Sequence, residues 1–194
     1  MLRVERLSGE ALSPYVDDIA RLRLQIFRDF PYLYNGDMEY ERRYLKTYLD
    51  SELAAVILAR DGSSVVGAST CLPLRDEEAS FKEPLSQLGM DTDRMFYLAE
   101  SVLDPHYRGK GIGLRFFQER ETYAKLLGGF SHACFCAVQR PLDHPLRPAS
   151  YTPLDAFWRK RGYAPIEASA KYTWLDVAQA TETEKQLQFW IKKL

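Results

Sequence analysis

Residues Val102–Leu114, with the sequence VLDPHYRGKGIGL, place three glycines between an apolar segment and a predicted helix. Because glycine has no Cβ atom, the backbone can turn tightly there and present its N–H groups toward a ligand. The first N–H groups of a helix have no partner inside the helix, and the helix dipole favours an anion beside them. Arg108 and Lys110 add positive charge. The stretch therefore predicts a strand, a loop and a helix that together bind a diphosphate.

Two familiar glycine-rich loops do not fit this stretch. A P-loop has Ser or Thr directly after its lysine, but Gly111 follows Lys110 here. A dinucleotide-binding fingerprint requires glycine where this chain has Leu114, and it lies early in a βαβ unit instead of in mid-chain. The pattern that remains is Arg108-x-x-Gly111-x-Gly113.

This pattern resembles the Gln/Arg-x-x-Gly-x-Gly/Ala signature of the GNAT superfamily of acetyl-CoA-dependent N-acetyltransferases. The chain reads LDPHYRGKGIG over residues 103–113, where members of the family commonly read V-x-P-x-Y-R-G-K-G-I-G. A second segment, AFWRKRGY over residues 156–163, resembles the family's A-x-x-Y-x-x-x-G-F element, with Trp158 in the place of the tyrosine. The two motifs and the predicted element order extend the resemblance over most of the chain.

The resemblance implies one GNAT-type domain over residues 1–194, with the mixed α/β fold of the acyl-CoA N-acyltransferases: a central, mostly antiparallel sheet flanked by helices. It implies that strands 94–103 and 131–138 separate to admit the pantetheine arm of acetyl-CoA, which pairs with the backbone of Val102 and Leu103. The other residues that the resemblance implies for binding this acyl donor are Arg108, Gly109, Lys110, Gly111, Ile112, Gly113 and Trp158.

Glu100 is the candidate general base, because it is the only acid in an otherwise apolar strand. Burial raises the pKa of a carboxylate toward neutrality, which suits a base, although a buried ion pair with an arginine is an equal alternative. The resemblance puts the family's acid at Trp158, whose indole N–H is not a useful proton donor. Tyr151 is therefore the candidate acid, with Tyr163 or water as alternatives.

Tyrosines and acids gather in the segment that follows the first predicted helix. Tyr32, Tyr34 and Glu39, with Asp37 and Glu41, would hold a cationic amine, and His144 in the loop 139–153 would line the same pocket. The competing interpretation is a tyrosine-rich core contact with acids at a helix N-terminus. Arg140 and Arg147 would instead favour an anionic acceptor, and the sequence does not decide between these readings.

Hydrophobic periodicity and turn residues predict the remaining elements. Helices are expected at 14–30, 37–49, 111–127 and 154–161, with a short helix before Gly89 and an amphipathic C-terminal helix marked by Leu187, Trp190, Ile191 and Leu194. Strands are expected at 2–7, 52–60, 64–72, 94–103, 131–138, 163–167 and 169–176. The C-terminal helix would pack on its own chain or on a second copy, so a homodimer is one expectation.

Composition restricts the class of protein. A net charge of -1 gives no field that steers the chain to nucleic acid or to an anionic membrane. The N-terminal MLRVERLSGE has no apolar secretory segment, and no uncharged run is long enough to cross a bilayer. Three cysteines in apolar runs, without zinc spacing, indicate reduced core thiols and no metal site. A cytoplasmic location is therefore expected.

Taken together, these features predict an N-acetyltransferase that moves the acetyl group of acetyl-CoA to a primary amine of a small molecule or a protein. Two alternatives remain at this point. One is a non-catalytic acyl-CoA-binding module with a regulatory or partner-binding role, which the tryptophan at position 158 favours. The other is an enzyme of the same fold that uses a different acyl-CoA.

Overall fold

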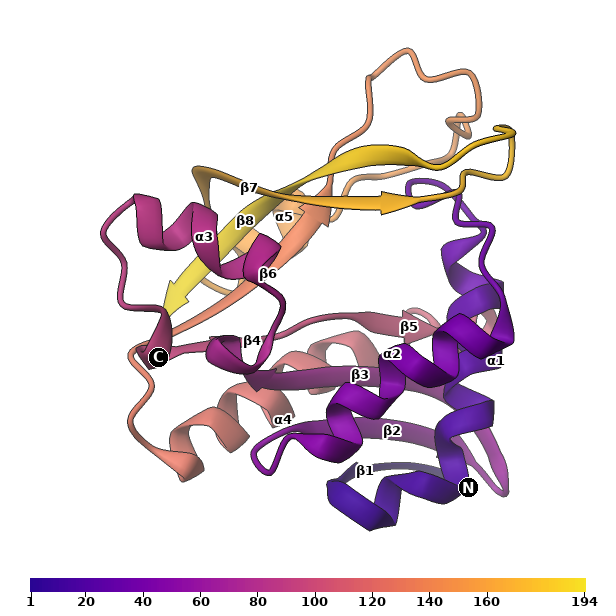
Figure 1. Ribbon diagram of the computed structural model, residues 1–194. Coiled ribbons are helices and arrows are strands. Elements are labelled where there is room, and N and C mark those ends of the chain that lie inside the picture. Colours follow the sequence, from indigo (N-terminus) through magenta and orange to yellow (C-terminus); the bar gives the residue numbers. More distant parts are fainter.

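The computed structural model describes all 194 residues and contains one eight-stranded sheet with helices on both faces (Figure 1). The strands are β1 (Leu2–Leu7), β2 (Ala55–Asp61), β3 (Ser64–Pro73), β4 (Met95–Tyr97), β5 (Ser101–Leu103), β6 (His132–Val138), β7 (Ala164–Trp174) and β8 (Thr183–Lys193). The α-helices are α1 (Val16–Phe27), α2 (Met38–Asp50), α3 (Ala79–Gln87), α4 (Ile112–Leu127) and α5 (Asp155–Arg159). Short 3₁₀ helices include η1 (Gly9–Tyr15), η2 (Leu74–Asp76) and η4 (Pro105–Tyr107).

The sheet follows the order β1-β2-β3-β4-β6-β8-β7, and β5 pairs with β3 alone. Every pair is antiparallel except β4 with β6, which is parallel. The mixed α/β fold with a mostly antiparallel sheet is therefore confirmed. No helix of the protein combines the length and the apolar character that crossing a membrane requires.

Helices cover the two faces of the sheet unequally. Helices α1 and α2 lie on one face, and α4 lies on the other (Figure 1). Successive residues of β2 point to opposite faces, so that Val56 packs in the core with α1 and α2 while Ile57 packs against Phe116 of α4. Both faces of the central strands are buried, which explains why their sequences read as nearly continuous apolar runs.

The predicted strand 94–103 is wrong in one respect, because the structure divides it into β4 and β5. Residues 98–100 between them leave the regular pattern. The apolar run conceals this break, since hydrophobicity reports burial and not the continuity of strand pairing. The segments 163–167 and 169–176, predicted as two strands, belong instead to the single strand β7, whose register shifts between Pro165 and Ser169.

The predicted C-terminal helix is wrong, because residues 183–193 form β8 between β6 and β7. The helical spacing that suggested it omits Phe189, whose side chain is fully buried. Leu187 and Phe189 enter one core and Trp190 enters the other, which is the two-residue alternation of a strand. Since both edges of β8 are paired within the chain, the segment offers no helical face to a second copy.

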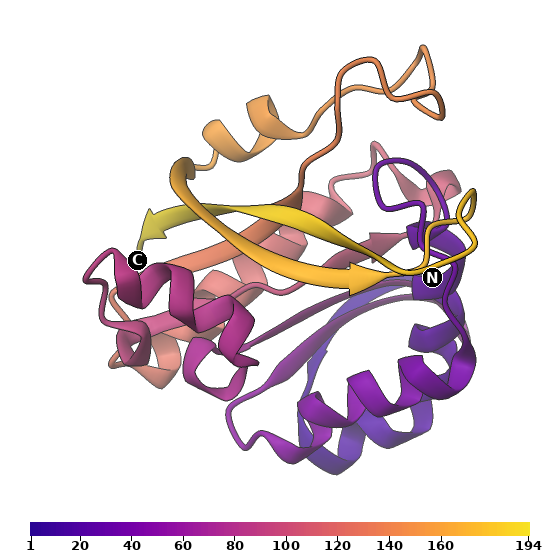
Figure 2. The same cartoon turned by 45° about the horizontal axis from the view of Figure 1, so that its top comes forward.

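The loop that joins β6 to α5 extends away from the sheet (Figure 2).

The three cysteines Cys71, Cys134 and Cys136 are free and buried.

Truncation of a central strand tests this arrangement of cores. Leu58 of β2 is fully buried, so Leu58→Ala should lower the free energy of unfolding by about 2–5 kcal/mol, because it leaves a cavity under α1 and α2. The matched control is Leu126→Ala on α4, whose side chain is 71% exposed and should cost little. Urea denaturation compares them, and equal effects would contradict this packing.

Candidate active site

The pairing between β4 and β6 stops in the middle of the sheet. Met95 to Tyr97 pair with His132 to Cys134, and the Leu98 N–H donates to the Cys134 carbonyl over 2.8 Å. Beyond Leu98 the chain no longer pairs with β6, and β5 pairs with β3 only. The expectation that strands 94–103 and 131–138 separate therefore holds. One edge of β5, which carries Val102 and Leu103, is left without a neighbouring strand.

Hydrogen bonds to the Glu100 carbonyl hold this break in place. The Thr70 N–H donates to it over 3.0 Å, and the Ser69 hydroxyl donates over 2.9 Å. Arg120 reaches it from α4, donating from Nη1 to the carbonyls of Glu100 and Thr70 over 3.3 Å each. Burial lowers the pKa of Arg120, which has no carboxylate partner and uses backbone carbonyls instead.

The glycine-rich loop lies at the N-terminus of α4. Gly109 and Gly111 have φ angles of 75° and 80°, a left-handed conformation that glycine adopts without strain. A Cβ atom at either position would meet no heavy atom within 4 Å, so the loop is open. Ile112, only 3% exposed, anchors the helix in the core behind the loop.

The backbone N–H groups from Gly109 to Leu114 have no hydrogen-bond partner within the protein. The first N–H of this region to find one belongs to Arg115, which donates to the Gly111 carbonyl over 3.0 Å. Arg108 and Lys110 are exposed beside these donors. A row of free amides at a helix N-terminus, flanked by two cations, is an arrangement that favours a bound anion, and the binding of a diphosphate there stays a prediction.

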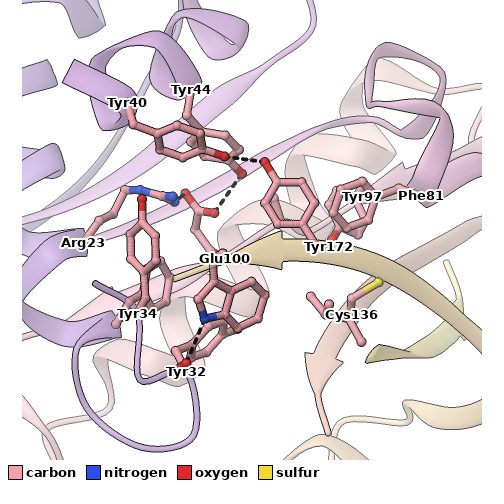
Figure 3. A pocket seen from close by; sticks show the side chains of 14 residues that line it. Arg23, Tyr32, Tyr34, Tyr40, Tyr44, Phe81, Tyr97, Glu100, Cys136 and Tyr172 are labelled. Atoms are coloured by element: carbon pink, nitrogen blue, oxygen red, sulfur yellow. Dashed lines mark hydrogen bonds and ion pairs between the residues drawn. The ribbon is translucent and has the colours of Figure 1, made fainter. Parts of the chain in front are cut away.

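A pocket lies on the face of the sheet that carries α1 and α2 (Figure 3). Its aromatic lining consists of Phe27, Tyr32, Tyr34, Tyr40, Tyr44, Phe81, Tyr97, Tyr172 and Trp174. The remaining lining residues are Arg23, Ala99, Glu100, Cys136 and Leu187. Because both the β4–β5 connection and β6 contribute to it, the pocket lies where these strands separate.

A buried ion cluster lies at one side of the pocket. Arg23 of α1 forms ion pairs with Glu41 of α2 and with Glu100, and the three side chains are 7%, 0% and 10% exposed. The Tyr44 hydroxyl donates to Glu100 over 2.9 Å (Figure 3). Burial by itself lowers the pKa of Arg23, but the charges of Glu100, Tyr44 and Glu41 outweigh it and raise the pKa well above its usual value. Arg23 is therefore a permanent cation.

Glu100 thus satisfies both interpretations made from its sequence position. It lines the pocket, as a catalytic group would, and it is ion-paired with an arginine, as a structural group would be. Tyr32 and Tyr34 also line the pocket as expected. Glu41, expected to hold an amine, is instead the fully buried partner of Arg23.

Several other predicted residues lie outside the pocket lining. Glu39 is exposed on α2, next to Asp37, which caps that helix by accepting the Glu39 and Tyr40 N–H groups over 2.9 Å each. His144 and Tyr151 pack against Phe30, with ring centroids 5.7 and 4.7 Å apart. The catalytic role of Tyr151 and the acceptor roles of His144 and Glu39 stay predictions that this geometry does not favour.

Trp158 lies in an aromatic cluster on the other face of the sheet. Its ring centroid is 5.1 Å from that of Phe135 and 5.0 Å from that of Trp190. The indole is half-buried by these rings. A contact with an acyl donor at Trp158 stays a prediction.

Arg140 does not serve an anionic acceptor, because its guanidinium is already committed. It binds both oxygens of Asp176 over 2.9 and 3.0 Å and donates to the carbonyls of Pro31 and Tyr32. The side chain is 9% exposed. Arg140 therefore ties the loop after α1 to the C-terminal strands. Arg147 packs over the rings of Phe30 and Tyr151.

Sequence reasoning missed Arg23, Tyr44, Tyr97 and Tyr172. The signal for Arg23 was present, because it lies four residues from both Ile19 and Phe27 on the apolar stripe of α1. A charge on such a stripe must find a buried partner. The tyrosines come from α2, β4 and β7, and no local pattern brings these elements together.

The sequence model of the Acetyltransferase (GNAT) family matches residues 19–149, which is more than half of the chain. The chain belongs to this family. None of the curated proteins matches the sequence significantly.

Solved structures share the GNAT fold over nearly the whole length. A ribosomal-protein-alanine N-acetyltransferase from Brucella melitensis has a TM-score of 0.64 at 15% identity, with 99% of each chain covered. A GNAT-family acetyltransferase from Staphylococcus aureus Mu50 has a TM-score of 0.60 at 14% identity, again with 99% of each chain covered. A GCN5-related N-acetyltransferase from Kribbella flavida has a TM-score of 0.59 at 15% identity, covering 100% of this chain and 98% of that one. At these identities the likeness shows the fold alone.

A second buried carboxyl lies near the cluster of this GNAT protein. Glu77, directly after η2, is 8% exposed and has no ion-pair partner. Burial, reinforced by the charge of Glu100, raises its pKa from the usual 4.5 to about 7. Glu77 is therefore the carboxyl of this region whose pKa burial raises toward neutrality.

The ion cluster predicts that replacing Arg23 lowers the free energy of unfolding much more than replacing Arg21 on the same helix. Arg23→Ala should lower the free energy of unfolding by about 3–5 kcal/mol, because it leaves Glu41 and Glu100 buried without their cation. Arg21→Ala, which removes an exposed pair with Asp18, is the control and should change little. Urea denaturation at pH 7 measures both, and similar values would contradict the cluster.

Glu77 predicts the sign of a pH dependence. Its folded-state pKa is raised, so the folded protein binds more protons than the unfolded chain between pH 4.5 and about 7. The stability that Glu77 contributes should be present below pH 4.5 and be lost as the pH rises through about 7. Denaturation across this range should show a shallower decline for Glu77→Gln than for wild type, with the exposed Glu78→Gln as control. Parallel curves for all three would refute this.

Proposed function

We propose that this GNAT protein is an N-acetyltransferase that transfers the acetyl group of acetyl-CoA to a primary amine. The observation that carries the proposal is the row of unpartnered N–H groups from Gly109 to Leu114, together with the uncovered edge of β5 that leads from it. That edge ends at Glu100, which lines the aromatic pocket on the opposite face. A long, polar acyl donor could therefore bind along the loop and this strand edge. An acceptor could bind in the pocket where the edge ends.

The residues present fit acetyl-CoA at both ends of this path. The free amides of the loop, with Arg108 and Lys110, would hold the diphosphate, and the open space above Gly109 and Gly111 leaves room for it. The amides of the pantetheine arm would pair with the backbone of Val102 and Leu103, as an added strand pairs with a sheet edge. Bound there, acetyl-CoA supplies an activated acetyl thioester.

The chain's own residues would then hold the amine and take its proton. Glu100 is the carboxylate that lines the pocket, so it would accept a hydrogen bond from the amine and receive the proton directly or through water. Arg23 and Tyr44 orient its two oxygens. Tyr44 is hydrogen-bonded to Glu100 in the pocket, so it is a better candidate than Tyr151 to give its proton to the leaving thiolate and to recover one from the protonated Glu100.

The glycine loop predicts a specific loss of donor affinity. Gly111→Ala forces a side chain into a left-handed backbone at the free amides, and should weaken acetyl-CoA binding by about tenfold or more in calorimetry. Gly89→Ala introduces a similar conformation, φ 73°, after α3 and is the matched control. Loss of affinity in both variants would indicate general strain and contradict a local role.

The catalytic role of Glu100 has its own test. With saturating acetyl-CoA and an amine library, wild type should release free thiol, and Glu100→Gln should lower kcat by about 100-fold or more while acetyl-CoA affinity is kept. Tight acetyl-CoA binding by wild type without turnover of any amine would refute the proposed activity and leave a binding module.

A further inference from the structure

We propose that the aromatic pocket selects a small cationic amine carried on an apolar body, aromatic by preference, and rejects amines that also bear a carboxylate. This inference rests on the proposed function, because that function supplies the reaction in which the bound amine is acetylated. It names the class of acceptor that the pocket recognises.

The walls provide apolar contact and few polar groups. Nine of the fourteen lining residues are aromatic, and Arg23 and Glu100 are the two charged ones. These two are already paired with each other. A phosphorylated acceptor would bring a negative charge to an arginine that Glu41 and Glu100 already neutralise, whereas a ring or short alkyl body would pack against the tyrosines.

The charges at the Glu100 side of the pocket are negative in sum. Arg23 supplies one positive charge against the two carboxylates of Glu41 and Glu100, and the Glu77 carboxyl lies nearby. An ammonium group completes the balance, with Glu100 as its hydrogen-bond acceptor and ring faces around it. A carboxylate on the acceptor would instead add a buried negative charge without a partner.

The nearest other cations lie at the Trp174 side of the pocket, where Arg140 and Lys185 carry two positive charges against the single carboxylate of Asp176. Arg140 and Lys185 approach the ring of Trp174, and both are spent on Asp176 and on backbone carbonyls. Their side chains are 9% and 5% exposed. Neither has a free donor to turn toward an acceptor carboxylate without leaving Asp176.

A tyrosine pair limits the size of the acceptor. The hydroxyls of Tyr40 on α2 and Tyr172 on β7 lie 2.5 Å apart and join the two sides of the pocket (Figure 3). On another side, Tyr34 forms a β-bridge with Asp176, which fixes the loop after α1 to the C-terminal strands. These links narrow the pocket on two sides, which favours a small molecule over a lysine carried on a protein surface.

Four matched amines test this inference: 2-phenylethylamine, phenylalanine, ethanolamine and a short lysine-containing peptide. Each is titrated into the acetyl-CoA-free protein by calorimetry, and kcat/KM is measured by thiol release. We expect 2-phenylethylamine to exceed each of the others by about tenfold or more in both affinity and kcat/KM. Equal or better binding of phenylalanine or of the peptide would overturn the inference. Selective binding of 2-phenylethylamine without turnover would uphold the pocket's selectivity and refute the acetyltransferase activity instead.

The charge argument has a separate test in two acids of the same helix. Glu41 touches Arg23 and does not line the pocket, so Glu41→Gln removes the excess negative charge and leaves the walls in place. It should reduce the preference for 2-phenylethylamine over phenylalanine by about tenfold. Glu39→Gln, at an exposed position of α2, should leave this ratio unchanged. If Glu41→Gln keeps the wild-type ratio while remaining folded, the charge argument is wrong.

Discussion

The end of strand pairing at Leu98 is the constraint on which both parts of the site depend. If β5 continued beside β6, the edge that carries Val102 and Leu103 would be covered and the two faces of the sheet would be separated. The break persists because the Glu100 carbonyl receives hydrogen bonds from Thr70, Ser69 and Arg120. Through these bonds the segment stays attached to β3 and α4 after its pairing with β6 has ended.

Two buried arginines approach Glu100 from opposite faces of the sheet. Arg23 comes from α1 and pairs with the carboxylate, while Arg120 comes from α4 and binds the carbonyl. Partners from other elements offset the cost of burying each charge. Arg23 also pairs with Glu41, and Arg120 also binds the Thr70 carbonyl. The position of Glu100 is thus fixed by groups on both sides, at the point where an open strand edge meets an aromatic pocket.

The glycine loop and the helix that follows it were predictable because each depends on local sequence. The separation of two strands was implied only by the resemblance to the GNAT superfamily, because the apolar run 94–103 conceals the break. Glycine at a left-handed position and free amides at a helix start follow from a few adjacent residues. The pocket was predicted only in part, through Tyr32 and Tyr34. Its other walls come from distant elements, and side chains such as Tyr97 and Tyr172 look like ordinary core residues in the sequence. The strand β8 was missed because its apolar residues fit helical spacing as long as Phe189 is ignored.

Arg120 gives the position of Glu100 a further consequence. The helix that carries Arg120 also begins with the glycine loop, so α4 connects the loop to the break in the sheet. A ligand that shifts α4 at one end would change the binding free energy at the other. By thermodynamic linkage the effect is reciprocal: whatever factor a molecule at the loop adds to affinity in the pocket, a molecule in the pocket must return to the loop.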